Sequence, residues 1–260
     1  MLMRIILTIV ATIASIIGAL TGVGGGIVLK TFYDLVNAGT VLEIGFYSTI
    51  MVFTMCIVAI LKHMKSGFRF NLPFLVSISV GSIAGGYIGN ELLNQAAKFI
   101  PENTVKLIQS IILFITLIYL TIYTRKSAKS NKEPNENWIG AFFLGLFLGA
   151  ISIFLAIGGG PLNVSLLVII FHFTMKQSTV YSIATVFFSQ ITKMISIAVS
   201  AQYAQFDMKM VPLLIIASIV GAYIGTVWNE KISSAKLESL YTIFMILITV
   251  ITGFNVVRFI

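Results

Sequence analysis

The chain carries one unusual motif twice, each time inside a long apolar stretch. Residues 21–30 read Thr-Gly-Val-Gly-Gly-Gly-Ile-Val-Leu-Lys, and residues 155–164 read Leu-Ala-Ile-Gly-Gly-Gly-Pro-Leu-Asn-Val. Adjacent glycines weaken a helix by about 1 kcal/mol each relative to alanine. Each motif therefore breaks the helix around it. Two equivalent breaks at membrane depth are typical of transporters built from internal repeats.

Shifting the sequence against itself supports the repeat. The same residues recur in the same order at a shift of 134 residues, which becomes 136 near the end of each half. The matched blocks are Gly24–Gly26 with Gly158–Gly160, Tyr47-Ser48 with Tyr181-Ser182, Val52-Phe53 with Val186-Phe187, and Gly85–Gly89 with Gly221–Gly225. We interpret the Gly85 and Gly221 blocks as close helix packing on small residues.

The composition is that of a membrane protein. Hydrophobic residues make up 58% of the chain and charged residues 10%, whereas a soluble domain has about 25% charged residues. Stretches of about 18 apolar residues can cross a bilayer. We expect an all-α membrane protein with about eight transmembrane helices in two internal repeats, the first helix of each half being broken at its glycines. The expected segments are 3–29, 42–61, 72–93, 105–123, 138–172, 178–201, 210–228 and 238–258.

These segments divide the chain into a first repeat (1–124), a polar linker (125–137) and a second repeat (138–260). The net charge of +8 fits the positive-inside rule better than nucleic-acid binding. With eight spans, we expect a cell-membrane protein whose linker and two termini all face the cytoplasm. If each glycine segment crosses twice, the count per half becomes five and the repeats are inverted. The charges are compatible with both arrangements.

Residues 1–20 have the form of a signal peptide, but the matching segment 138–157 is internal, so we keep them in the fold. The single cysteine, Cys56, excludes a disulfide framework. His63 and His172 have no second ligand at metal spacing. We therefore expect no metal, no cofactor and no catalytic residue, and the sequence leaves the oligomeric state open.

The glycine motifs have the chemistry of an anion site. Broken backbone within a membrane must line a cavity or be buried in protein, because lipid satisfies no amide. Pro161 suits the first turn of a restarted helix, whose free amides and positive dipole end attract anions. Asn163 offers a donor and an acceptor close by, and Gln190 is similar but could face a neighbouring helix. The candidate substrate-binding backbone comprises Gly24, Gly25, Gly26, Gly158, Gly159, Gly160 and Pro161.

Two lysines near the apolar interior add candidate charges. Lys193 follows Ser182, Thr185 and Ser189 on one helical face, which would suit an anion path. Alternatively the hydroxyls bond their own helix and Lys193 extends to an interface. Lys30 closes the first motif and could neutralise a bound anion or act as an interfacial anchor.

The two motifs resemble those of the sulfite exporter TauE/SafE family of bacterial anion transporters. The matching residues are Gly22, Gly24, Gly25 and Gly26 in the first half and Gly158, Gly159, Gly160, Pro161, Asn163 and Val164 in the second. Thr31 stands where the family has proline, and Ala156 replaces a glycine. The resemblance implies a multi-pass transporter of small anions such as sulfite, sulfonates or other sulfur-containing organic anions, with or without ion coupling.

Two other functions compete with transport by a carrier. An intramembrane enzyme needs a facing base and nucleophile or metal ligands, and the sequence shows no such motif and no acidic residue near a predicted midplane. A channel needs a selectivity filter or a charged pore ring, and neither is visible. The duplicated glycine breaks favour a transporter that is not an enzyme.

Overall fold

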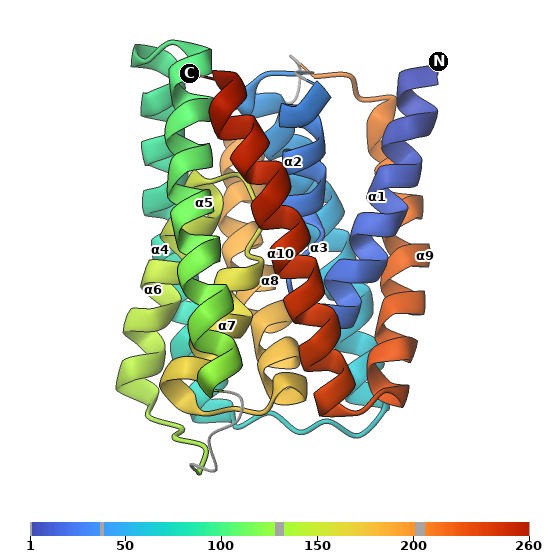
Figure 1. The fold of residues 1–260 in the computed structure, drawn as a ribbon, viewed down its shortest axis with the longest axis vertical. Helices are drawn as coiled ribbons and strands as arrows, with labels where there is room; N and C mark the ends of the chain where they lie inside the picture. Colours follow the sequence, from blue (N-terminus) through green and yellow to red (C-terminus); the bar gives the residue numbers. More distant parts are fainter. Residues whose placement is uncertain (1, 37–38, 128–132, 201–205, 260) are drawn as a thin grey trace.

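The computed structural model describes residues 2–36, 39–127, 133–200 and 206–259. In these ranges the chain forms ten helices and no strand (Figure 1). Seven of them are long and apolar enough to cross a membrane, which confirms the expected all-α membrane fold. The helices are α1 (Leu2–Thr21), α2 (Gly26–Val36), α3 (Val41–Lys65), α4 (Leu72–Phe99), α5 (Glu102–Ser127), α6 (Trp138–Phe154), α7 (Pro161–Phe171), α8 (Met175–Val199), α9 (Met210–Lys231) and α10 (Ser234–Phe259).

The first expected segment, 3–29, is divided at its glycines into α1 and α2. Both helices have their outer ends on the same side of the bundle. At this side Arg4 of α1 forms an ion pair with Asp207 at 2.7 Å, and the carbonyl oxygen of Leu35 in α2 accepts a hydrogen bond from Arg258 near the C-terminus. The chain therefore enters on α1 and returns on the 11-residue α2.

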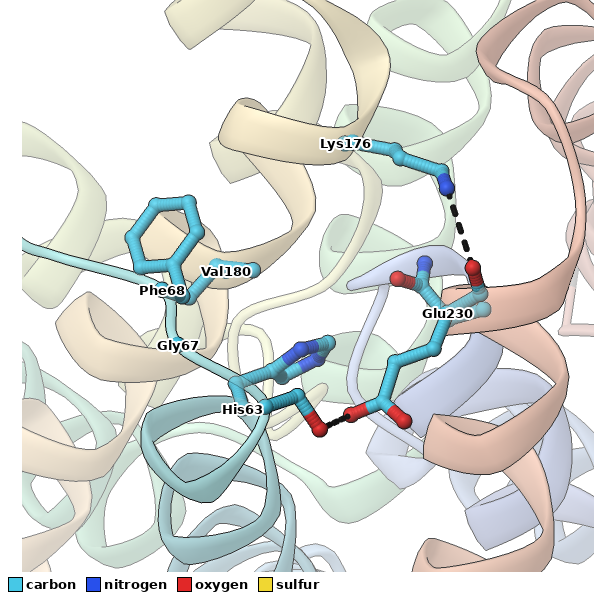
Figure 2. Close-up of a pocket in the computed structure, with 8 residues that line it drawn as sticks. His63, Gly67, Phe68, Lys176, Val180 and Glu230 are labelled. Atoms are coloured by element: carbon cyan, nitrogen blue, oxygen red, sulfur yellow. Dashed lines mark hydrogen bonds between the residues drawn. The ribbon is translucent and has the colours of Figure 1, made fainter.

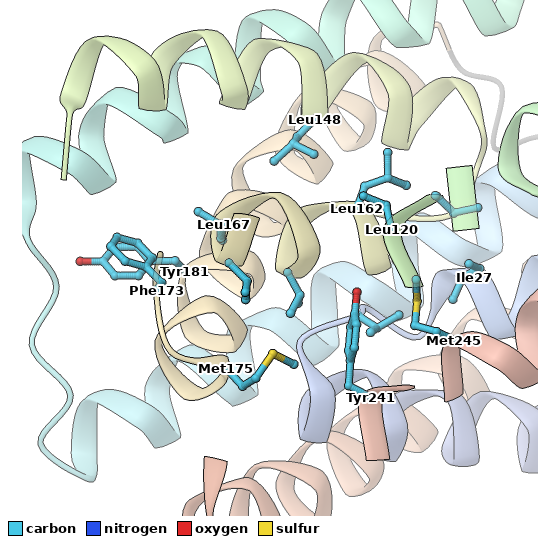
Figure 3. Close-up of a cluster of buried hydrophobic side chains, with 14 of the residues drawn as sticks. Ile27, Leu120, Leu148, Leu162, Leu167, Phe173, Met175, Tyr181, Tyr241 and Met245 are labelled. Carbon is cyan, nitrogen blue, oxygen red and sulfur yellow. The ribbon is translucent and has the colours of Figure 1, made fainter. Parts of the chain in front are cut away.

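The second expected segment, 138–172, is divided in the same way into α6 and α7. The amide of Asn135, just before α6, donates to the carbonyl oxygen of Phe171 at the end of α7 at 2.9 Å. This second hairpin therefore opens on the side of the linker. Its α7 is enclosed by apolar side chains: Leu162 and Leu167 of α7 lie among Leu120 of α5, Leu148 of α6 and Met245 of α10 (Figure 3).

The two halves run in opposite directions through the bundle. Each half consists of a hairpin followed by three long helices, so the chain ends each half on the side opposite to its start. Figure 1 shows both termini at one end, the terminal end, and the chain around the linker at the other, the linker end. Of the two arrangements left open by the sequence, the structure has the one with five helices per half, and the two sets of five run in opposite directions; that they are inverted repeats stays a prediction. The superposition of the halves stays a prediction.

This topology corrects the expected sidedness, because the linker and the termini cannot share one side of the membrane. It also changes which basic residues lie at the same end of the bundle. Helix ends and loops at the linker end carry Lys62, Lys65, Arg69, Arg125, Lys126, Lys176, Lys231 and Lys236, and those at the terminal end carry Arg4, Lys98, Lys106, Lys209 and Arg258. Lys129 and Lys132 lie outside the described residues. The positive-inside rule now favours a cytoplasmic linker with both termini outside.

Cysteine labelling of whole cells tests this orientation with two exposed lysines from opposite ends. In a Cys56→Ala background, Lys98→Cys should react with an impermeant maleimide added outside the cells. Lys65→Cys should react only after the membrane is permeabilised, because it lies at the more basic end. Labelling in the reverse order would show that the termini are cytoplasmic.

Glycines bring two helix pairs into backbone contact. A Cβ atom built on Gly85 of α4 would lie 1.9 Å from the carbonyl oxygen of Leu146 in α6. A Cβ on Gly225 of α9 would lie 2.2 Å from the carbonyl oxygen of Ile16 in α1. The Gly85 and Gly221 blocks therefore provide close helix packing, as expected from their spacing.

Candidate functional site

The two glycine loops, residues 22–25 and 155–160, cross inside the bundle. A Cβ atom built on Gly24 would lie 2.8 Å from the carbonyl oxygen of Gly158, and one on Gly160 would lie 3.0 Å from that of Val23. A Cβ on Gly26, where α2 begins, would lie 2.3 Å from the carbonyl oxygen of Ile157. Backbone meets backbone at this crossing, and side chains larger than hydrogen are excluded.

The turns also require left-handed backbone angles. Gly159 and Gly160 have φ values of 102° and 87°, which residues with a Cβ rarely adopt. Ala156, which stands where the resembled motif has glycine, takes a φ of 56°. This angle lies in the small left-handed region open to other residues, so the second loop keeps its turn without that glycine.

Helix α8 holds the first loop by hydrogen bonds, and α3 packs against the second loop. Ser182 of α8 donates its hydroxyl to the carbonyl oxygen of Gly22 at 2.7 Å, and Thr179 donates to that of Thr21 at 3.2 Å. On the opposite side, Ser48 of α3 occupies the repeat position of Ser182. Its buried hydroxyl has no hydrogen-bond partner.

A small cavity lies beside the second loop, between α3, α6 and α8. Its volume is about 10 Å³, which is room for about one water molecule. We call it the central cavity. Its lining consists of Gly45, Ser48, Thr49, Ser152, Ile153, Ala156, Gly158, Gln190 and Lys193.

Lys193 is the charged residue in the lining of the central cavity. The residue is 4% exposed, and no hydrogen bond or ion pair to it occurs in the described part of the chain. Gly45 lies beside its ammonium group, since a Cβ built there would make ordinary contact with Lys193 Nζ at 3.7 Å. Next to it, the side-chain amide of Gln190 is buried with neither its oxygen nor its nitrogen bonded. The cavity thus combines an unpaired cation with unpaired donors.

Two helix N-termini point at the same region. α2 begins at the first loop and α7 at the second, and the two run outward in opposite directions (Figure 1). The cap of α7, Gly160, offers no side-chain hydrogen bond to the first amides. Because the N-terminus of a helix carries partial positive charge, both half-helices raise the potential at the crossing.

The other lysine candidate is already neutralised. Lys30 Nζ lies 2.7 Å from Asp34 Oδ2, and each side chain is 2% exposed. The pair sits within α2, which extends past the expected end of the span at residue 29. Asp34 was not among the predicted site residues, although a spacing of four residues on a helix is the signal for such a pair. Lys30 is therefore not an exposed interfacial anchor.

The remaining candidates do not line the central cavity. Thr185 and Ser189 donate their hydroxyls to backbone carbonyl oxygens of their own helix, at 2.8 Å and 2.9 Å. Asn163 is buried at the start of α7, and its Oδ1 has no partner. Of the polar stripe on α8, Lys193 alone reaches the cavity. Ser48, Thr49 and Ser152 line it instead; the repeat relation between Ser48 and Ser182 could have indicated Ser48.

A family model described as sulfite exporter TauE/SafE matches residues 7–252. The chain belongs to the TauE/SafE family. A curated relative, the probable membrane transporter protein YunE of Bacillus subtilis (strain 168), is 24% identical over 276 residues, covering 94% of this chain and 95% of the relative. No solved structure matches.

Membership in the TauE/SafE family makes this chain a multi-pass membrane transporter. The second departure from the family motif, Thr31 in place of proline, lies buried inside α2. Its hydroxyl donates to the carbonyl oxygen of Ile27 at 2.7 Å. α2 therefore continues through this position with an added side-chain bond.

Proposed function

We propose that this transporter carries small anions, in particular sulfite, sulfonates or other sulfur-containing organic anions, across the cell membrane. The observation that supports the proposal is the unpaired Lys193 in the central cavity. Burying an ammonium group is costly unless an opposite charge or hydrogen-bond acceptors compensate it. Charged groups inside membranes are accordingly rare, and usually functional. A transported anion supplies the missing partner.

The groups around Lys193 fit an oxyanion. The Gln190 amide and the Ser48 hydroxyl are donors without partners, and they line the same cavity as the lysine. Hydrogen bonds in which one partner is charged contribute about 1.5–3 kcal/mol each. No carboxylate or imidazole lines the cavity, so its composition favours binding over acid–base chemistry.

The cavity must widen to accept its substrate, because it has room for about one water molecule. On the side of the terminal end it is closed by apolar residues: Val41, Leu93 and Val105 are at most 2% exposed and form one cluster. A Cβ on Gly45 would meet Leu93 as well as Lys193, at 3.9 Å and 3.7 Å. In our proposal this is a closed state, from which the cavity opens to one side at a time.

Uptake of radiolabelled sulfite into proteoliposomes tests the proposed substrate class. The protein should raise uptake above that of protein-free liposomes, and unlabelled ethanesulfonate should compete. Choline and glycerol, a cation and a neutral solute, should not. Uptake equal to that of protein-free liposomes, or equal competition by choline, would refute the proposal.

A further inference from the structure

A second cavity opens at the linker end, between α3, α8 and α9 (Figure 2). Its volume is about 350 Å³, much larger than that of the central cavity. We call it the linker-end pocket. Its lining consists of His63, Ser66, Gly67, Phe68, Lys176, Val180, Asn229 and Glu230.

The pocket is lined by one cation, Lys176, and one anion, Glu230, and Lys62 beside it neutralises the anion. The carboxylate of Glu230 is already taken by Lys62, at 2.9 Å, and by the hydroxyl of Ser66. Lys176 donates to the backbone carbonyl oxygen of Glu230 at 3.2 Å (Figure 2), so its charge has no carboxylate partner. It also lies in the first turn of α8, whose N-terminal dipole end is positive.

A buried ring nitrogen points to a ligand in the same pocket. His63 is 3% exposed, and its Nε2 atom has no hydrogen-bond partner. Its imidazole lies between Phe68 and Glu230 (Figure 2). A buried ring nitrogen without a partner costs free energy, which an acceptor group bound in the pocket would recover.

The floor of the pocket adjoins the first glycine loop. Asn229 donates its side-chain amide to the carbonyl oxygen of Leu20 at 2.6 Å, at the end of α1. Val180 follows Thr179, whose hydroxyl binds the carbonyl oxygen of Thr21. The linker-end pocket therefore adjoins the end of α1 that leads into the first glycine loop, and the central cavity lies beside the second loop.

Two polar positions of the pocket are apolar in the other half, whereas the repeat shift of 136 places Asn94 at the position of Glu230. The repeat shifts place Leu42 at the position of Lys176 and Leu93 at that of Asn229. Leu93 belongs to the apolar cluster that closes the terminal end, and Leu42 packs against it. The charge of Lys176 at the linker end thus has no counterpart in the other half.

We propose that the linker-end pocket is a docking site for the transported oxyanion, held by Lys176 and His63 before it passes the glycine loops. The proposal rests on the proposed function. An oxyanion in the pocket forms an ion pair with Lys176 and accepts a hydrogen bond from His63 Nε2. The phosphate of an anionic lipid headgroup has the same chemistry, so the test must separate the two sources.

The test measures initial rates of labelled sulfite uptake against concentration, in zwitterionic proteoliposomes. Lys176→Gln should raise KM about tenfold with Vmax within twofold, because it keeps a donor and removes the charge. Lys176→Arg should stay within threefold of the parental KM, and His63→Leu should raise KM about threefold. The matched control is Lys65→Gln, an exposed lysine of α3 at the same end that does not line the pocket; its KM should stay within twofold.

The outcomes separate the two proposals. If the parent transports sulfite and Lys176→Gln keeps the parental KM, the docking site is refuted and the proposed function stands. If the parent gives no uptake, both are refuted. If the KM difference between parent and Lys176→Gln arises only when anionic phosphatidylglycerol is added, the pocket holds a lipid headgroup and the docking site is refuted.

Discussion

Lys193→Met is expected to remove most sulfite transport without unfolding the protein. Methionine keeps a long side chain but loses the charge that pairs with the anion. A charged hydrogen bond contributes about 1.5–3 kcal/mol, and 1.4 kcal/mol corresponds to a factor of ten. Uptake should therefore fall at least about tenfold. The thermal unfolding temperature in detergent should be unchanged or higher, since the variant no longer buries an unpaired ammonium.

Two further variants separate charge from packing at this position. Lys193→Arg keeps a positive charge and should retain part of the transport. Lys98→Met, at an exposed lysine at the end of α4, is the matched control and should transport like the parent. If Lys193→Met inserts normally and carries sulfite at the parental rate, the lysine has a purely structural role.

Gly85→Ala is expected to destabilise the bundle more than any exposed substitution. The new methyl group would lie 1.9 Å from the carbonyl oxygen of Leu146, and a backbone atom cannot turn aside as a flexible side chain can. α4 and α6 would have to move apart along their whole contact. Overpacking costs about 1–3 kcal/mol, and a backbone clash lies at the upper end. The unfolding temperature of the purified protein should fall by several degrees.

Gly140→Ala provides the control for this prediction. Gly140 lies in the first turn of α6, and a Cβ atom there would make ordinary contact with Phe171 at 3.5 Å. Alanine also favours the helix by about 1 kcal/mol over glycine. The control should be as stable as the parent or more stable. Equal unfolding temperatures for Gly85→Ala and the parent would contradict the observed packing of α4 on α6.

The sequence was sufficient for the class of fold and for the places where helices break. Apolar length predicts spans, and adjacent glycines predict interruptions, because both effects are local. The direction of the chain after each break is not local. α2 turns back because its 11 residues pack among α1, α3 and α10. No periodicity in the sequence predicts the direction in which α2 runs. The expected sidedness of linker and termini failed for this reason.

The candidate site was predicted in part. Lys193 could be found because a lone lysine in an apolar helix is conspicuous. The other polar residues of the cavity could not be found in this way, since Ser48 and Ser152 come from other helices. They lie near Lys193 only because the folded chain brings α3, α6 and α8 together. Thr185 and Ser189 share the helical face of Lys193, but their hydroxyls bond the backbone, the ordinary alternative for such residues in a helix.

The central claim is that an oxyanion binds at Lys193, beside the crossing of the glycine loops. Crystals grown with selenite, the selenium analogue of sulfite, test it most directly, because selenium gives an anomalous signal. The account predicts a selenium peak in the widened central cavity, with a selenite oxygen within hydrogen-bond distance of Lys193 Nζ and the Gln190 amide. Selenium peaks found only elsewhere in the bundle, with none beside Lys193, would contradict it.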